Sequence, residues 1–314
     1  MSALADTASA PSVRETLCIS RQIRRASLVG FQKFTTPDAS YRMTAPTFVN
    51  LSDAAIPLKE FVVKSLDDST FRQSNFNIIF FGENGNPMLV KNDTTMRDTE
   101  EFQAAYAAFG KPESTTELTF GIRSGHWYLV DDSSRDYQMD NYPVAPGRGF
   151  NIHNAGHSAG VELTFAGAVA NEDYKVTVPD STYALSGNSM PVDVALKDLT
   201  VESIDSSTFR QSNFNLIFFG SNGNPMKVKD DDQMRDTEEF QAAYAAFGKP
   251  ESTTELTFGI RSGHWYLVDD SSRDYMMDDY VIKAGRGFNI HNAGHSAGVR
   301  VTVPSPILDQ NAAE

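Results

Sequence analysis

The sequence predicts a mainly β protein built as two tandem β-sandwich domains of jelly-roll or immunoglobulin-like type, each with one short inserted α-helix. Three observations support this prediction: a long internal repeat, short apolar segments separated by turn signals, and one amphipathic segment in each repeat. The stretch at residues 96–137 returns letter for letter at residues 234–275. All six histidines and both tryptophans lie within the two copies of the wider repeat, so any binding they support is expected twice.

The repeat divides the chain into four segments. It holds without a gap from Leu58 and Leu196 to Gly160 and Gly298. We predict an N-terminal arm at residues 1–27, a first β-sandwich repeat at residues 28–170, a second at residues 171–304 and a disordered tail at residues 305–314. A chain of 314 residues fits two domains of roughly 150 residues each. The joint at residues 166–172 is short, which predicts that the two repeats stay close together.

Within each repeat, short strand patterns alternate with turn signals. The first repeat opens at Val29, and the second at Tyr174, each with a strand, a Pro-Asp turn and a second strand. Further strands are predicted at residues 75–81, 88–91, 116–123, 126–131, 150–153 and 161–165. Turns are predicted between them at residues 83–87, which contain Asn-Gly, at Ser124-Gly125 and at residues 146–149.

One segment of each repeat has helical spacing instead. In the first repeat, Asp98 is a candidate cap, and Glu101 stands three residues later, as in a capping box. Gly110 provides the expected end of the helix. Between these signals lies a single apolar stripe, formed by Phe102, Ala105, Tyr106 and Phe109. This stripe predicts a helix that packs against the sheets.

Charge and cysteine content restrict the function. The formal net charge of −14 argues against binding to nucleic acid or to anionic membranes, which need a basic face. No apolar run approaches the roughly 18 residues of a membrane-spanning helix. The single cysteine, Cys18, excludes an intrachain disulfide framework and leaves a buried thiol or a pairing with a second chain. The first residues contain no apolar h-region that would indicate a signal peptide.

The N-terminal arm has the pattern of a half-buried strand. Apolar and polar residues alternate along it with a period of two. Four arginines against Asp6 and Glu15 make the arm about +2, beside a body of about −16. Such an arm is suited to pair with an edge strand of a neighbouring molecule, while the alternative is that it folds back on its own domain. The candidate assembly residues are Val13, Leu17, Ile19, Ile23, Arg24 and Arg25.

A second set of residues is suited to a sugar-binding face. Trp127 is expected in the core, which turns His126 and Tyr128 of the same strand outward. An outward aromatic side chain with nearby Asp and Arg is typical of carbohydrate recognition. The candidate ligand-binding residues are His126, Tyr128 and Arg135, with His264, Tyr266 and Arg273 in the second repeat.

Metal binding is the third alternative. His153 and His157 stand four residues apart, as His291 and His295 do, but Asn154 and Gly156 favour a loop over the helix that a zinc pair needs. The acidic runs at residues 131–136 and 230–232 offer oxygen ligands for calcium without matching a known calcium loop. We expect hydrogen-bonded loop histidines, solvated acidic turns and no cofactor.

The motifs resemble those of uncharacterised tandem-repeat β-sandwich proteins that some bacteria secrete or carry on their surface. The resemblance rests on short motifs in both repeats. They are Val29–Lys33 with Pro37 and Tyr41, Trp127-Tyr128 with Asp131-Asp132, Pro146–Phe150 and Ala166–Val169, and, in the second repeat, Tyr174–Pro179 and Gly285–Phe288. The second repeat lacks the AGAV ending. The resemblance implies a β-sandwich fold and an extracellular or cell-surface location, with a cytoplasmic location as the alternative.

These observations predict a structural protein and not an enzyme. No nucleophile elbow, CxxC pair or phosphate-binding loop is present. We expect a self-assembling subunit of an extracellular filament, tube or surface layer, whose partner is itself. Strand complementation by the arm and packing between domains would join the subunits. The alternative is a glycan-binding module or adhesin with one site per repeat.

Overall fold

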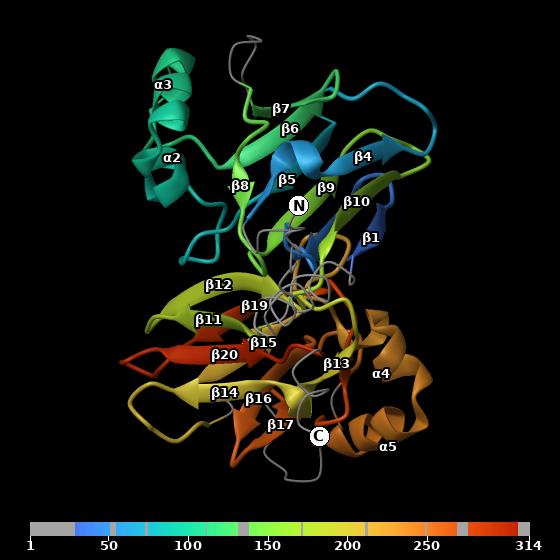
Figure 1. Ribbon diagram of the computed structural model, residues 1–314. Coiled ribbons are helices and arrows are strands. Elements are labelled where there is room, and N and C mark those ends of the chain that lie inside the picture. Colours follow the sequence, from blue (N-terminus) through green and yellow to red (C-terminus); the bar gives the residue numbers. More distant parts are fainter. Residues whose placement is uncertain are drawn as a thin grey trace, which may run out of the picture.

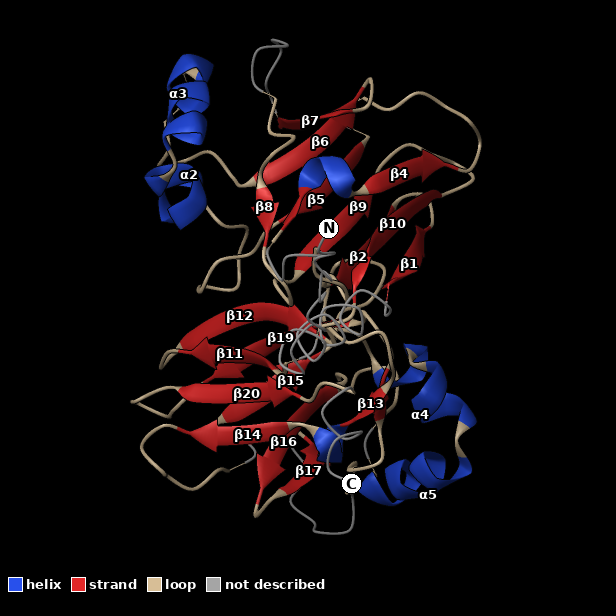
Figure 2. Ribbon diagram, in the orientation of Figure 1, coloured by secondary structure: helices blue, strands red, loops and turns tan. Residues whose placement is uncertain are grey.

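The computed structural model describes residues 29–50, 55–72, 75–110, 112–130, 138–170, 172–210, 213–248, 250–268 and 276–306. Within these residues the chain is mainly β, and every pair of neighbouring strands is antiparallel. Figure 2 shows the longer helices at the sides of the sheets and short helical turns in front of them. The mainly β prediction is therefore confirmed.

The first repeat forms a three-stranded sheet in the order β1-β10-β4, a five-stranded sheet in the order β2-β9-β5-β6-β7, and the pair β3-β8. The strands are β1 (Val29–Thr36), β2 (Ser40–Thr44), β3 (Ile56–Pro57), β4 (Val62–Ser65), β5 (Phe76–Ile79), β6 (Thr119–Arg123), β7 (His126–Leu129), β8 (Pro143–Val144), β9 (Phe150–Asn154) and β10 (Val161–Ala168).

The second repeat has the same topology, strand for strand. Its sheets have the orders β11-β20-β14, β12-β19-β15-β16-β17 and β13-β18. The strands are β11 (Tyr174–Val178), β12 (Thr182–Gly187), β13 (Val194–Ala195), β14 (Thr200–Ser203), β15 (Phe214–Ile217), β16 (Thr257–Arg261), β17 (His264–Leu267), β18 (Val281–Ile282), β19 (Gly287–Asn292) and β20 (Val299–Val303).

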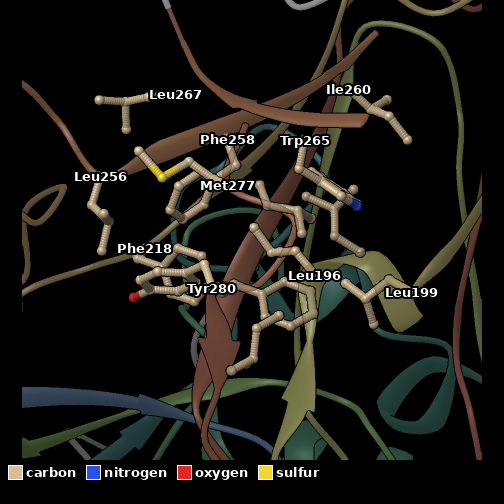
Figure 3. Packing of buried hydrophobic residues seen from close by; sticks show 14 of the residues in the cluster. Leu196, Leu199, Phe218, Leu256, Phe258, Ile260, Trp265, Leu267, Met277 and Tyr280 are labelled. Atoms are coloured by element: carbon tan, nitrogen blue, oxygen red, sulfur yellow. The ribbon is translucent and has the colours of Figure 1, made fainter. Parts of the chain in front are cut away.

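Each repeat has its own hydrophobic cluster, to which both of its larger sheets contribute. The rings of Phe150 on β9 and Phe165 on β10 lie 6.0 Å apart, so the five-stranded and three-stranded sheets meet across the cluster. Trp127 is 1% exposed, which confirms its predicted place in the core. Figure 3 shows the corresponding cluster of the second repeat, where Trp265 and Phe258 lie among aliphatic and aromatic side chains.

Each repeat contains a pair of short helices where a single helix was predicted. They are α2 (Thr94–Asp98) and α3 (Glu100–Phe109), with α4 (Asp232–Asp236) and α5 (Glu238–Phe247) in the second repeat. Short 3-10 turns also occur: η1 (Leu58–Glu60), η2 (Val90–Asn92), η3 (Leu196–Asp198) and η4 (Val228–Asp230).

The predicted helix cap was wrong. Asp98 is the last residue of α2, and α3 begins after Thr99, whose side chain makes no capping hydrogen bond. The cap of α2 is Asp93, whose side chain accepts a hydrogen bond from the backbone amide of Met96 at 2.8 Å. The predicted end was right: Gly110 follows α3 with φ 71°, the left-handed conformation that glycine adopts without strain.

Three predicted boundaries also differ from the structure. Residues 88–91 do not form a return strand: Leu89 makes one isolated bridge to Glu117, and the chain then turns into η2 on its way to α2. The predicted joint begins inside β10, which continues to Ala168. Ser305, expected in the tail, is 2% exposed because its amide donates to Asp173 at 2.9 Å.

The two repeats contact each other reciprocally. The backbone amide of Tyr41 donates to the carbonyl of Ser221 at 2.7 Å, and the amide of Tyr183 donates to that of Glu83 at 2.7 Å. These are matching positions, because Tyr183 corresponds to Tyr41 and Ser221 to Glu83 in the repeat. Each contact therefore occurs twice, as expected for an approximate two-fold axis between the repeats. In Figure 1, α2 and α3 lie to the left of the upper repeat and α4 and α5 to the right of the lower one, consistent with this axis.

Glycines allow the repeats to approach closely. A Cβ atom on Gly149 would lie 2.7 Å from backbone atoms of Leu185 and Ser186 in the other repeat. A Cβ atom on Gly287 would lie 2.6 Å from backbone atoms of Met43 and Thr44, at the corresponding place. The second glycine of each Gly-Arg-Gly motif thus serves the contact between repeats. This contact also covers the outer edges of β2 and β12, which would otherwise be free for pairing.

Candidate functional site

An exposed apolar row crosses the outer face of the three-stranded sheet in the first repeat. Val29 and Phe31 of β1 are 58% and 67% exposed, and Val62 of β4 is 62% exposed. Phe31 lies opposite Ala166 of β10, which is also exposed. Among the described residues, β1 and β4 form the two edges of this sheet. Exposed apolar side chains beside unpaired strand edges are typical of a surface that contacts another chain.

The second repeat is polar at the corresponding positions. Asp173 takes the place of Phe31, and Thr200 of β14 takes the place of Val62. Thr200 lies beside Thr302 of β20, on the same outer face. The apolar row therefore belongs to one repeat only, although the cores of the two repeats are nearly the same. The difference breaks the approximate two-fold symmetry at the molecular surface.

A pocket of about 210 Å³ lies at the junction of the repeats, next to this row. Phe48, Val49 and Tyr174 supply apolar walls. Val49 bridges to Ala168, which also pairs with Val29 at the start of the apolar row. The apolar row and the junction pocket are thus neighbouring parts of one surface, which we call the junction surface.

Acidic and polar groups surround the junction pocket. Glu172 and Asp173 line it, so its rim is negative. Ser189 also lines it and is 4% exposed, and its hydroxyl has no hydrogen-bond partner. The pocket therefore offers apolar contact together with attraction for a cationic segment.

The candidate assembly arm lies outside the described residues, and so does Cys18. The structure also leaves undescribed the acidic run at residues 131–136 and two residues of the predicted sugar-binding set, Arg135 and Arg273. The predictions for these residues remain predictions. The undescribed arm residues are Val13, Leu17, Ile19, Ile23, Arg24 and Arg25.

The described part of the predicted sugar-binding set is not an open surface. Tyr128 points away from the core, as predicted, but is only 3% exposed. The guanidinium of Arg123 lies 4.6 Å from the centre of its ring, and Gln138 donates to its hydroxyl at 3.3 Å. His126 is exposed, with Nδ1 2.7 Å from the carboxylate of Asp140.

The second repeat repeats this arrangement. His264 Nδ1 lies 2.7 Å from Asp278, and the guanidinium of Arg261 lies 4.7 Å from the ring centre of Tyr266. The tyrosines share the strand face of the exposed histidines, but the prediction of outward, open aromatic side chains was wrong, because Tyr128 and Tyr266 are 3% and 5% exposed. The neighbours that cover them come from adjacent strands and loops, which the local sequence pattern does not place.

The paired histidines do not face a common point. His153 stacks on Tyr41, with ring centroids 4.2 Å apart and an interplanar angle of 5°. His157 lies in the loop after β9, where a loop was predicted, but it is fully buried and its Nδ1 lies 2.6 Å from the hydroxyl of Ser69 instead of a backbone group. His291 and His295 are placed in the same way, on Tyr183 and Ser207. In the described part of the chain, no three His, Cys, Asp or Glu side chains are grouped to hold a metal ion.

A Ser-Asp-His cluster surrounds His157 and was not predicted. Asp67 accepts hydrogen bonds from the hydroxyl of Ser65 and the amide of Ser69, and these bonds hold its pKa well below the usual range. Burial lowers the pKa of His157, which keeps the ring neutral. In a hydrolase triad, histidine stands between aspartate and serine. Here the serines stand between Asp67 and His157, so the order required for a nucleophile is missing.

A second buried cluster was also missed. Arg148 donates to the carboxylate of Asp93 at 2.7 Å and to the hydroxyl of Tyr142 at 2.8 Å, and Tyr142 donates to the same carboxylate at 2.7 Å. Burial raises the pKa of Tyr142 beyond its ordinary range. Because Asp93 also caps α2, this cluster fixes the helix pair to the sheets. The arginine of the predicted turn at residues 146–149 thus has a structural role.

The acidic run at residues 230–232 has equivalent structural partners. Asp231 accepts from Arg286 at 2.9 Å and from Tyr280 at 2.9 Å, and it caps α4. Asp232 accepts from Arg235 at 2.6 Å. These carboxylates point to different partners, so the described structure does not gather them around a calcium position.

Comparisons with models of known protein families, with curated proteins and with solved structures found no match. Among the described residues, no helix is both long and apolar enough to cross a membrane.

Proposed function

We propose that the protein is a structural subunit that assembles with copies of itself into an extracellular filament, tube or surface layer, and that each repeat is a β-sandwich domain. The observation that carries the proposal is the apolar row on β1 and β4, with Phe31 67% and Val62 62% exposed. Exposed apolar side chains on a sheet with free edges favour association with another chain.

The asymmetry of the row supports open-ended assembly. The reciprocal contact between the repeats uses matching surfaces and is complete within one chain. The apolar row occurs only on the first repeat, so it must meet a different surface on the next molecule. Contacts between two different surfaces produce rings or open filaments instead of closed dimers.

The N-terminal arm of a neighbouring molecule is our proposed occupant of the junction surface. The arm precedes Val29, which itself belongs to the apolar row, so an exchanged arm would join adjacent subunits. Its apolar residues match the apolar walls of the pocket, and its arginines match the rim formed by Glu172 and Asp173. An edge of the three-stranded sheet can accept an added strand through backbone hydrogen bonds.

Negative-stain microscopy and light scattering of the purified protein test this proposal. We expect polymers of the complete chain and monomers after deletion of residues 1–27. The double substitution Phe31→Thr and Val62→Thr should weaken association at least ten-fold, because burying one such side chain contributes about 1.5–3 kcal/mol. Lys175→Thr, on the outer face of the second repeat, is the matched control and should assemble normally. A monomeric complete chain, or undiminished polymers without the arm, would contradict the proposal.

A further inference from the structure

A separate pocket of about 450 Å³ opens on the five-stranded sheet of the second repeat. Ile217 of β15 and Thr257 of β16 form its floor, and His291 of β19 and the segment at residues 250–255 line its sides. Ile217 and Thr257 pair directly in the sheet and therefore share a face. Their neighbours Leu216 and Phe258 belong to the hydrophobic cluster, so the pocket lies on the side of the sheet away from the core.

Two buried polar groups on this face lack hydrogen-bond partners. Thr257 lines the pocket and is only 8% exposed, and its hydroxyl has no hydrogen-bond partner. Asn289 is only 4% exposed, and its side-chain carbonyl oxygen also has no hydrogen-bond partner. Asn289 pairs with Ile217, so it shares the face that Ile217 and Thr257 present to the pocket. A buried polar group without a partner costs about 1–3 kcal/mol, and a ligand can remove that cost.

The same feature occurs in both repeats. Thr119 and Asn151 hold the corresponding positions in the first repeat, and their side-chain oxygens are likewise buried without partners. These residues are identical in the two repeats, so the orphaned groups belong to the repeated unit itself. Buried polar groups without partners are few in folded proteins, and each calls for an explanation.

The pocket wall is held in place by the other repeat. His291 stacks on Tyr183, with ring centroids 4.1 Å apart. Gly85, in the turn of the first repeat, packs against this tyrosine, and a Cβ atom added to it would lie 3.2 Å from the ring of Tyr183. The imidazole is therefore fixed before any ligand arrives, which reduces the entropy lost on binding. Burial lowers the pKa of His291 and keeps the ring neutral.

The lining is mostly neutral and combines hydrogen-bonding groups with aliphatic surface. Threonine hydroxyls and the side-chain amide of Asn215 stand beside Ile217 and Val268. The carboxylate in the lining, Glu255, forms an ion pair with Lys227 at 3.0 Å. Sugars present the complementary combination, with hydroxyl groups at the ring edge and C–H groups on the ring faces. The volume is in the range typical of small-ligand sites.

We propose that this pocket binds a neutral saccharide, of one or two sugar units, through Thr257 and His291, which line it, and through Asn289, which shares the face beside Ile217. The site differs from the set His264, Tyr266 and Arg273, and it does not depend on self-assembly. A subunit of a surface structure with such a pocket would also attach to carbohydrate.

The test uses the complete chain and a panel of neutral mono- and disaccharides, with isothermal titration calorimetry on the best-bound sugar. Thr257→Val should reduce affinity at least ten-fold while leaving the melting temperature unchanged or higher, since it removes an orphaned buried hydroxyl. Asn289→Leu is a second variant that should act in the same direction. Thr302→Val, on the outer face of the three-stranded sheet, should bind as the original chain does.

Two results would overturn this inference. The first is an absence of binding to every sugar of the panel at millimolar concentration. The second is a sugar affinity that Thr257→Val and Asn289→Leu both leave unchanged in folded protein. Because monomeric variants without residues 1–27 can be titrated in the same way, the outcome is independent of the assembly experiments.

Discussion

The backbone amide of Tyr41 donates a 2.7 Å hydrogen bond to the carbonyl of Ser221, a residue of the other repeat. The corresponding bond, from Tyr183 to Glu83, has the same length. This reciprocity means that the two repeats are not arranged head to tail. The units instead face each other, and each covers an edge strand of its partner. New contacts must therefore use surfaces in which the repeats differ.

Close backbone approach predicts that alanine is not tolerated at the second glycine of either Gly-Arg-Gly motif. We expect Gly149→Ala and Gly287→Ala each to destabilise the protein by about 1–3 kcal/mol, because a methyl group would meet the backbone of the other repeat. Urea unfolding measures the change. Gly82→Ala is the control, since the nearest atoms to its added Cβ lie at 3.4 Å or more. Equal stability of all three variants would contradict the close contact.

The Asp93 cluster predicts a graded loss of stability. Asp93→Ala leaves buried Arg148 without its carboxylate and should cost about 3–5 kcal/mol. Tyr142→Phe removes one hydrogen-bonding hydroxyl and preserves the ion pair, and should cost about 1 kcal/mol. Asp231→Ala should match Asp93→Ala, because the second repeat has the same arrangement. Urea unfolding of the three variants is the measurement. A smaller loss of unfolding free energy for Asp93→Ala than for Tyr142→Phe would be inconsistent with this account.

The buried histidines predict that stability falls in mild acid. The pKa values of His157 and His295 are lowered in the folded protein, so the unfolded chain binds more protons. The stabilisation by the neutral, buried histidines is complete above the ordinary histidine pKa of 6.5 and decreases as the pH falls below that value. Unfolding free energies at pH 7.5 and 5.5 should therefore differ more for the original chain than for the double variant His157→Asn and His295→Asn. Equal pH dependence of the two proteins would refute this explanation.

The carboxylate of Asp67 should affect the stability of the protein at a lower pH than the histidines do. Its lowered pKa means that its stabilising effect is present above the ordinary value of 3.8 and is lost as the pH falls further. Asp67→Asn should consequently reduce the acid sensitivity that remains below pH 3.8. Acid unfolding followed by circular dichroism is the measurement. If the variant and the original chain unfold in parallel over this range, the hydrogen bonds from Ser65 and Ser69 do not have the assigned effect.

The ion pair between Lys227 and Glu255 should contribute little. Both side chains are partly exposed, at 33% and 49%, and exposed pairs contribute about 0–1 kcal/mol. The first repeat has Leu89 in place of Lys227, so it provides a natural comparison. We expect Lys227→Leu to change the free energy of unfolding by less than about 1 kcal/mol. A larger loss in urea unfolding would show that the pocket wall depends on this pair.

Local patterns of the sequence were sufficient for much of the fold. Apart from the return strand at residues 88–91, the order of strands, the buried position of Trp127 and the helix end at Gly110 were predicted correctly. Each depends on residues that are close in the chain, where periodicity and backbone preference act. The wrong helix cap shows the limit: Asp98 had the right spacing, but Asp93 is held by Tyr142 and Arg148 and takes the role instead.

The sequence by itself determined that the chain carries one β-rich unit twice, because duplication, two-residue alternation and turn residues are all visible along it. Only the tertiary structure decided how the units meet, which glycines allow that contact, and where apolar and unpartnered polar groups are gathered. Those features join residues more than a hundred positions apart, such as Tyr41 and Ser221. Their positions follow from packing across the whole molecule, which no local pattern records.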